Sequence, residues 1–290
     1  MGGIVVAQSP RWKLAGASVI GSQHRDSGGR CEDAWSSVRR KCSDCQEILS
    51  VCVCDGAGST SHGWLGARVS SRVLSSWLAD NFDSVFANSA EDNRWAICSV
   101  AKRAIRCLAG KAELLLRDYA CTVVAIAANT DGRWIAVHLG DGAIIGRFQD
   151  GLRPISFPRK GEFANETFFI TDEDAAENLE VKLSVECDTV TAATAFALFT
   201  DGVEVTLVNR HTRQVAPALA HMLDWLVGHA EDEVSQDLEE QLKSVFQQRT
   251  GDDCTLAMMV DSIAKAAESN GLSESTANTD VCCHTSHSDS

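Results

Sequence analysis

The sequence predicts an α+β fold in which two antiparallel sheets pack face to face and helices cover the outside. Three observations support this class. Short apolar, β-branched segments are joined by connections too short to hold a crossover helix, which favours antiparallel pairing. Four longer segments carry apolar residues at helical spacing. Groups of strands separated by pairs of helices are typical of layered sheets with outer helices.

Three strands are expected before the first helix, at residues 17–20, 33–38 and 51–54. In the third, Val51 and Val53 alternate with cysteines before the chain reaches Asp55, and a period of two is typical of a strand. The short connections predict that these strands pair with one another in one antiparallel sheet. Apolar residues spaced by three and four then predict helices over 67–78 and 95–116.

A second group of strands is expected at residues 121–128, 134–139, 143–148, 179–187 and 192–200. The turns Asn-Thr-Asp-Gly at 129–132 and Gln-Asp-Gly at 149–151 are typical of hairpins. Residues 154–166 show little periodicity, so an irregular flap is expected there.

Helices at 214–229 and 234–246 and a last strand at 254–260 complete the expected fold. One folded domain is therefore expected over residues 1–262. Residues 263–290 are polar and rich in Ser, Asn and Thr, and we expect a disordered tail.

Composition excludes several classes of partner. Hydrophobic residues make up 44% and charged residues 23% of the 290 residues, which is ordinary for a globular protein. A formal net charge of −14 argues against nucleic acid and anionic membrane surfaces. The N-terminal residues lack the pattern of a signal peptide, and no apolar run approaches about 18 residues. We therefore expect a cytoplasmic protein with no membrane contact.

The chain contains 12 cysteines, which a reducing compartment would keep as thiols. Six lie in apolar segments and are expected in the core, namely Cys52, Cys54, Cys98, Cys107, Cys121 and Cys254. Cys42 and Cys45 form a CxxC pair that could bind zinc with the Cys-Cys-His run at 282–284. Their separation matches no ordered zinc module, so a structural zinc site is the less favoured interpretation.

Four aspartates each lie at the end of an apolar strand. They are Asp33, Asp55, Asp201 and Asp252. Strand ends of two packed sheets can meet at one rim, where carboxylates repel one another unless cations neutralise them, and oxygen ligands suit Mg²⁺ or Mn²⁺. Two such ions about 3.5–4 Å apart can activate a bridging water for attack on phosphorus. Each aspartate taken alone is explained as well by a turn, since Asp-Gly is a common hairpin signal.

Six short motifs follow one another along the chain. They are Gly21-Ser22-Gln23-His24 with Cys31-Glu32-Asp33-Ala34, Asp55-Gly56-Ala57-Gly58-Ser59, Asp118-Tyr119-Ala120-Cys121-Thr122, Gly140-Asp141-Gly142, Thr200-Asp201-Gly202-Val203, and Gly251-Asp252-Asp253-Cys254-Thr255-Leu256. In this order they resemble the bacterial type of the PPM (type 2C) metal-dependent serine/threonine protein phosphatases, over roughly residues 11–261. The resemblance implies a four-layer α-β-β-α sandwich with a catalytic domain over residues 1–262.

The resemblance also implies a centre with two Mn²⁺ or Mg²⁺ ions. The implied catalytic and metal-ligating residues are Asp33, Asp55, Asp201 and Asp252, together with the carbonyl of Gly56, Glu32 through a water, and Asp141 at a weaker third metal. The implied phosphate-binding and substrate-binding residues are His24, Arg30 and Asn165.

The chain departs from the family pattern at four positions. Ala57 stands where many eukaryotic members carry a histidine proposed as general acid, and Gly28 where they carry a phosphate-binding arginine. His62 lies near Ala57, but capping a helix or facing solvent is the favoured interpretation of it. Leu65 replaces a glutamate common in bacterial members, and Val205 stands where an acid would help to hold the third metal.

The resemblance implies a monomeric phosphatase that removes phosphate from phosphoserine and phosphothreonine in protein substrates, opposing a Ser/Thr kinase. Two alternatives remain open: a phosphatase of another phosphomonoester, and a catalytically silent PPM-like binding module. A structural Ca²⁺-binding protein is disfavoured because the chain has no contiguous D-x-D-x-D-G loop.

Overall fold

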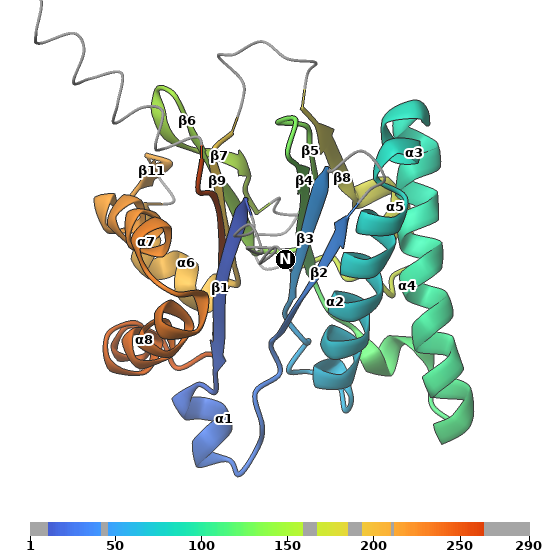
Figure 1. Ribbon diagram of the computed structural model, residues 1–290. Helices are drawn as coiled ribbons and strands as arrows, with labels where there is room; N and C mark the ends of the chain where they lie inside the picture. The colour runs from blue at the N-terminus through green and yellow to red at the C-terminus, as the bar shows by residue number, and fades with distance from the viewer. Residues whose placement is uncertain (1–10, 42–45, 159–166, 185–192, 210–211, 264–290) are drawn as a thin grey trace, which may run out of the picture.

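The computed structural model of the protein describes residues 11–41, 46–158, 167–184, 193–209 and 212–263. Two five-stranded sheets face each other, and helices cover the outer face of each, so the described part of the molecule has four layers (Figure 1). Neighbouring strands within both sheets are antiparallel. The α+β sandwich expected from the sequence is confirmed.

The first sheet contains, in spatial order, β1 (Trp12–Val19), β12 (Cys254–Asp261), β9 (Ala195–Phe199), β6 (Ala143–Phe148) and β7 (Gly151–Ser156). Its outer helices are α6 (Asp201–Leu207), α7 (Pro217–Gly228) and α8 (Glu231–Ser244). A small hairpin of β10 (Val208–Asn209) and β11 (Gln214–Val215) lies between α6 and α7. The 3₁₀ helix η2 (Phe246–Gln248) lies between α8 and β12.

The second sheet contains β2 (Ala34–Lys41), β3 (Glu47–Cys54), β4 (Val123–Asn129), β5 (Trp134–Leu139) and β8 (Glu180–Leu183). Its outer layer consists of α2 (Gly63–Asp80), α3 (Phe82–Ala87), α4 (Ala90–Ala112) and α5 (Ala175–Asn178). The 3₁₀ helix η1 (Leu116–Tyr119) joins α4 to the loop before β4. The short helix α1 (Ser22–Asp26) lies at one end of the sandwich (Figure 1).

The prediction that the first three strands pair in one sheet is wrong at β1. β2 and β3 pair with each other, but β1 pairs with β12 along its whole length, from Trp12 with Asp261 to Val19 with Cys254. The segment at 20–33, which contains α1, carries the chain from one sheet to the other. A connection of that length does not oblige the strands on either side of it to be neighbours.

The side chains of β3 alternate between two cores, because both faces of the strand are covered. Leu49, Val51 and Val53 pack between the two sheets. Cys52 and Cys54 face the helices, and their sulfur atoms lie 3.7 Å apart. The period of two in the sequence therefore separates an inner face of Leu and Val side chains from an outer face that carries the two cysteines.

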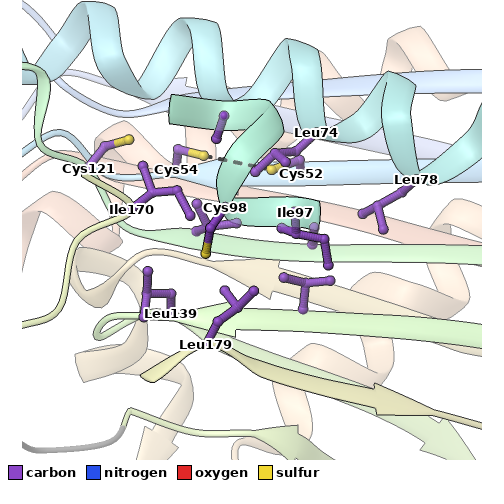
Figure 2. Close-up of a cluster of buried hydrophobic side chains, with 14 of the residues drawn as sticks. Cys52, Cys54, Leu74, Leu78, Ile97, Cys98, Cys121, Leu139, Ile170 and Leu179 are labelled. Atoms are coloured by element: carbon purple, nitrogen blue, oxygen red, sulfur yellow. Dashed lines mark hydrogen bonds between the residues drawn. The ribbon is translucent and has the colours of Figure 1, made fainter. Parts of the chain in front are cut away.

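Figure 2 shows the core between this sheet and its helices. Leu74 and Leu78 of α2 and Ile97 and Cys98 of α4 are fully buried there against the cysteines of β3. Of the six cysteines expected in the core, five are buried as predicted. The sixth, Cys107, is exposed, because α4 turns this residue away from the sheet.

Strand ends from both sheets gather at the end of the sandwich where α1 lies. The paired residues there are Val19 with Cys254, Ala34 with Cys54, Val123 with Leu139, and Ala143 with Phe199. The loops that leave these strands carry the motifs singled out in the sequence, so the registers bring the motifs to one rim.

In the described ranges, no helix combines the length and the apolar character needed to cross a bilayer.

Replacing Leu74 by Ala tests the core under α2. Leu74 is fully buried between the helix and the sheet, so Leu74→Ala is expected to lower the free energy of unfolding by about 2–5 kcal/mol, measured by urea denaturation. Arg72→Ala, on the exposed face of the same helix, is expected to change it by no more than about 0.5 kcal/mol. Equal effects of the two changes would contradict this packing.

Candidate active site

A cavity of about 430 Å³ opens at the rim where the strand ends gather. Four carboxylates line it, from Asp55, Asp141, Asp201 and Asp252. The loop at 55–59 forms another part of the wall. No Lys or Arg lies among the described residues that line this cavity.

Each of these carboxylates is placed by the end of a strand. Asp55 directly follows β3, and Asp141 lies in the short connection from β5 to β6. Asp201 follows β9 and is the first residue of α6, a short helix that the sequence pattern does not predict. Asp252 lies two residues before β12.

Asp33, the residue before β2, lies behind the lining of the cavity. It is 3% exposed, and the hydroxyl of Thr200 donates a hydrogen bond of 2.8 Å to its Oδ2. Burial, with the charge of Asp253 as a second cause, raises the pKa of Asp33 to about 8, although the hydrogen bond from Thr200 opposes the rise. Asp33 therefore supports the cavity from inside the sandwich.

The five carboxylates act on one another electrostatically. Burial is the largest cause that raises the pKa of Asp55 well above its ordinary value. The charges of Asp33, Asp201, Asp141 and Asp252 raise it further, in that order. Such a cluster stays ionised at neutral pH only when cations compensate it, so its electrostatics favour bound metal.

The donor chemistry fits hard divalent cations. All the acidic groups supply oxygen, which Mg²⁺ and Mn²⁺ prefer. Oδ1 of Asp33 and Oε2 of Glu32 are buried and have no hydrogen-bond partner among the described residues. In the same ranges, no three His, Cys, Asp or Glu side chains already form a closed ligand set, so the carboxylates must adjust to coordinate an ion.

Two glycines allow the close approaches that form the cavity. A side-chain carbon on Gly56 would lie 2.4 Å from the backbone of Gly63, and one on Gly202 would lie 2.0 Å from the carbonyl oxygen of Asp253. Both distances are shorter than a real contact permits. The glycine after Asp55 and the glycine after Asp201 therefore let the two aspartates sit against neighbouring backbone.

Asp253 supports the site through its contacts, and the sequence interpretation assigned it no role. Its Oδ1 accepts a hydrogen bond of 2.6 Å from the N–H of Gly21, and its Oδ2 accepts one of 2.6 Å from the N–H of Glu32. The same Oδ2 lies 3.0 Å from Nδ1 of His24. This carboxylate thus fixes both ends of the segment at 20–33 to the start of β12.

His24 lines the cavity, as a phosphate-binding residue should. Nδ1 of His24 lies beside Asp253, and its Nε2 faces the loop at Gly58. A side-chain carbon added to Gly58 would lie 3.8 Å from this Nε2. Burial alone lowers the pKa of His24, but the interaction with Asp253 and the charges of Glu32 and Asp252 outweigh it and raise the pKa. The neighbouring carboxylates therefore favour the protonated form of this ring more than water would.

The structure separates the other two substrate-binding candidates. Arg30 is not among the lining residues; its guanidinium lies 4.3 Å from the centre of the Trp64 ring, a cation–π distance. Asn165 lies outside the described residues. Glu32 is half-buried, and burial raises the pKa of its carboxyl while the nearby charge of His24 lowers it.

The departures from the family pattern have clear positions. Ala57 lines the cavity and offers no side-chain proton donor. His62 precedes α2 without a side-chain cap; its Nδ1 lies 2.8 Å from the Ser61 hydroxyl, and its ring packs on Tyr119. Leu65 packs against the core under α2.

Val205 is 47% exposed on α6, so α6 carries no acid where the family pattern would place one for a third metal.

Two hydroxyl residues of the wall were also missed. Thr122 lines the cavity, and its hydroxyl accepts a hydrogen bond of 3.1 Å from the N–H of Asp55. The hydroxyl of Thr167 donates a hydrogen bond of 3.0 Å to Oδ2 of Asp141. The sequence signal for Thr122 was its place at the end of the motif at 118–122, to which no role had been assigned.

Comparison with known proteins identifies the family. The sequence profile described as "Protein phosphatase 2C" matches residues 20–243. The chain belongs to the protein phosphatase 2C family. The expectation drawn from the order of the motifs is thereby confirmed, and this chain is a phosphoprotein phosphatase.

One relative of this phosphatase is serine/threonine-protein phosphatase 3 of Escherichia coli (strain K12). The two are 30% identical over 253 residues, which cover 85% of this chain and 97% of the relative.

Solved structures agree in fold. Serine/threonine phosphatase Stp1 from Staphylococcus aureus superposes with a TM-score of 0.51 at 15% identity, over 90% of this chain and 99% of that one. A sex-determining protein of C. elegans superposes with a TM-score of 0.55 at 13% identity, over 88% and 66%.

Asp253→Ala tests the role of the buried carboxylate. It leaves one buried and one part-buried N–H group without their acceptor, so the free energy of unfolding is expected to fall by about 2–4 kcal/mol, measured by urea denaturation. Asp253→Asn keeps one acceptor oxygen and should lose less. If the alanine variant is as stable as the unchanged protein, the segment at 20–33 is held by other contacts.

Proposed function

We propose that this phosphatase hydrolyses phosphoserine and phosphothreonine in proteins modified by a Ser/Thr kinase, and that it uses two Mn²⁺ or Mg²⁺ ions. The protein is further proposed to be a monomer and to act in the cytoplasm. The observation that carries it is the convergence of five strand-end carboxylates, four lining one cavity and Asp33 behind its wall, with no Lys or Arg in the described lining.

The residues proposed to hold the ions differ in their position around the cavity. Those at its wall are Asp55, the carbonyl of Gly56, Asp201 and Asp252, with Asp141 at a weaker third ion. Those behind the wall are Asp33 and, through a water, Glu32. When bound, the ions would neutralise these carboxylates and lower the pKa of a bridging water for attack on phosphorus.

The protein's own side chains would bind and orient the phosphate. Among the described lining residues, His24 is the one that can carry a positive charge, and Asp253 fixes the orientation of its ring. Nε2 of His24 is thus available to donate a hydrogen bond to a phosphate oxygen. The hydrogen bond from the N–H of Asp55 to Thr122 fixes the backbone of the loop that opposes it.

The departing serine or threonine oxygen must gain a proton, and Ala57 supplies none. His62 is engaged with Ser61 and Tyr119, so the described wall offers no dedicated side-chain acid on this loop. Water in the cavity is therefore the proposed proton source. The reaction rate should then depend on pH less steeply than if a single histidine donated the proton.

Activity of the purified full-length chain tests the proposal. It is expected to hydrolyse p-nitrophenyl phosphate and a phosphothreonine peptide with Mn²⁺, and to lose both activities in EDTA. Asp201→Asn is expected to lower kcat by about 100-fold or more, because it removes one negative ligand oxygen from the cavity.

Asp150→Asn is the matched control, since Asp150 lies in the exposed β6–β7 turn away from the cavity, and its activity should be unchanged. Activity that survives EDTA or Asp201→Asn would refute the metal mechanism. No activity with any metal would favour a silent binding module, and activity on small phosphomonoesters alone would favour a different substrate.

His24→Ala is expected to raise KM for the phosphopeptide about tenfold, because it removes a cationic donor from the cavity wall. The concentration of Mn²⁺ that gives half-maximal activity should change less than KM does. His62→Ala, which removes a histidine outside the cavity lining, is the control and should leave KM unchanged. If His24→Ala has the KM of the unchanged enzyme, His24 does not bind the phosphate.

A further inference from the structure

A second cavity, of about 730 Å³, lies between α4, η1 and the turn at 171–173. One of its walls is a stripe along α4 formed by Trp95, Ser99, Lys102 and Arg106. Spacings of three and four place these residues on one face of the helix. We call this cavity the α4 groove.

The α4 groove is cationic on a strongly acidic chain. Lys102 and Arg106 project from α4, and Arg117 of η1 lines the groove with them, although the net charge of the chain is −14. Two acids also line it. The Oδ2 of Asp172 accepts a hydrogen bond of 2.7 Å from the N–H of Phe169, so this carboxylate is directed to its own backbone, and Glu173 stands exposed at the end of the turn.

The groove also exposes apolar surface that the fold does not require. Trp95 is 51% exposed and Leu115 is 56% exposed, and both line the groove. Large apolar side chains beside cations form a surface that suits a peptide with acidic and apolar residues.

Two chain segments connect the α4 groove to the catalytic cavity. Phe169 lines the cavity and Thr171 lines the groove, so their Cα atoms are at most about 7 Å apart. On the other side, the N–H of His62 donates a hydrogen bond of 2.9 Å to the carbonyl of Asp118 in η1. The turn at 171–173 and η1, which form the groove together with α4, are thereby connected to loops that border the cavity.

We propose that the α4 groove docks an acidic segment of the phosphoprotein substrate, a few residues away from the phosphorylated residue in the catalytic cavity. This inference rests on the proposed function. The cations Arg106 and Arg117 would pair with the acidic side chains, and Trp95 and Leu115 would cover the apolar atoms of the segment. The groove would then select among phosphoproteins by charge, which the catalytic cavity alone does not do.

Two phosphothreonine peptides test the proposal. One carries Asp and Glu three to five residues from the phosphothreonine, and the other carries Asn and Gln there. The unchanged full-length enzyme is expected to have a KM about fivefold lower for the acidic peptide, which corresponds to two exposed ion pairs. The doubly changed Arg106→Glu/Arg117→Glu protein should lose this preference. Its kcat, and its activity on p-nitrophenyl phosphate, should be unchanged.

The control is Arg103→Glu/Lys111→Glu, which makes the same change of charge at exposed positions of α4 outside the groove. It should retain the preference. The preference should also vanish in about 1 M salt, where the screening length is about 3 Å. An equal loss in the control, or equal KM values for both peptides with the unchanged enzyme, would overturn the docking site.

Binding without catalysis separates this proposal from the proposed function. Fluorescence anisotropy of the labelled acidic peptide, with full-length protein, needs no turnover. If the protein hydrolyses nothing but binds the acidic peptide through Arg106 and Arg117, the proposed function fails and the docking site stands. If it hydrolyses both peptides equally and binds neither preferentially, the docking site fails alone.

Discussion

The buried carboxylate of Asp253 is the interaction on which the geometry of the site depends. It accepts hydrogen bonds from the backbone of Gly21 and Glu32 and lies against the ring of His24. These three contacts hold the segment that crosses between the two sheets. Without them, β1 and β2 would still belong to their own sheets, but the segment between them would lose three of the contacts that fix its position beside β12. A charge-assisted contact inside the rim is therefore as important as the carboxylates that face the cavity.

The cavity carboxylates place the opposite demand on the fold. Their mutual repulsion favours separation, and only the strand registers of two sheets keep them together. The two sheets offset the free-energy cost of this repulsion, because their apolar strands are buried on both faces and pack tightly. The sandwich thus supplies rigid support for an arrangement of charges that local structure would not adopt, and the glycines after Asp55 and Asp201 allow the final close contacts.

Much of this arrangement could be predicted from sequence, because each aspartate follows or precedes a strand of unambiguous pattern. The supporting role of Asp253 could not, since it is adjacent to Asp252 and only the fold brings the backbone of Gly21 and Glu32 to its carboxylate. Nor does any local signal place Arg30 on Trp64. β1 and its partner β12 lie at opposite ends of the described sequence, and neither strand pattern indicates the pairing.

The pairing of β1 with β12 has a consequence for how the protein is made. Arg11 and Asp261, which are 250 residues apart, form an ion pair of 2.7 Å at the end of this ladder. A nascent chain leaves β1 without its neighbour until almost all the described residues have been synthesised, and closing so long a loop slows folding. Asp252 and Asp253 arrive just before that last strand. Translation therefore completes the sheet and the acidic cluster almost together, and a product that ends before Asp252 lacks both.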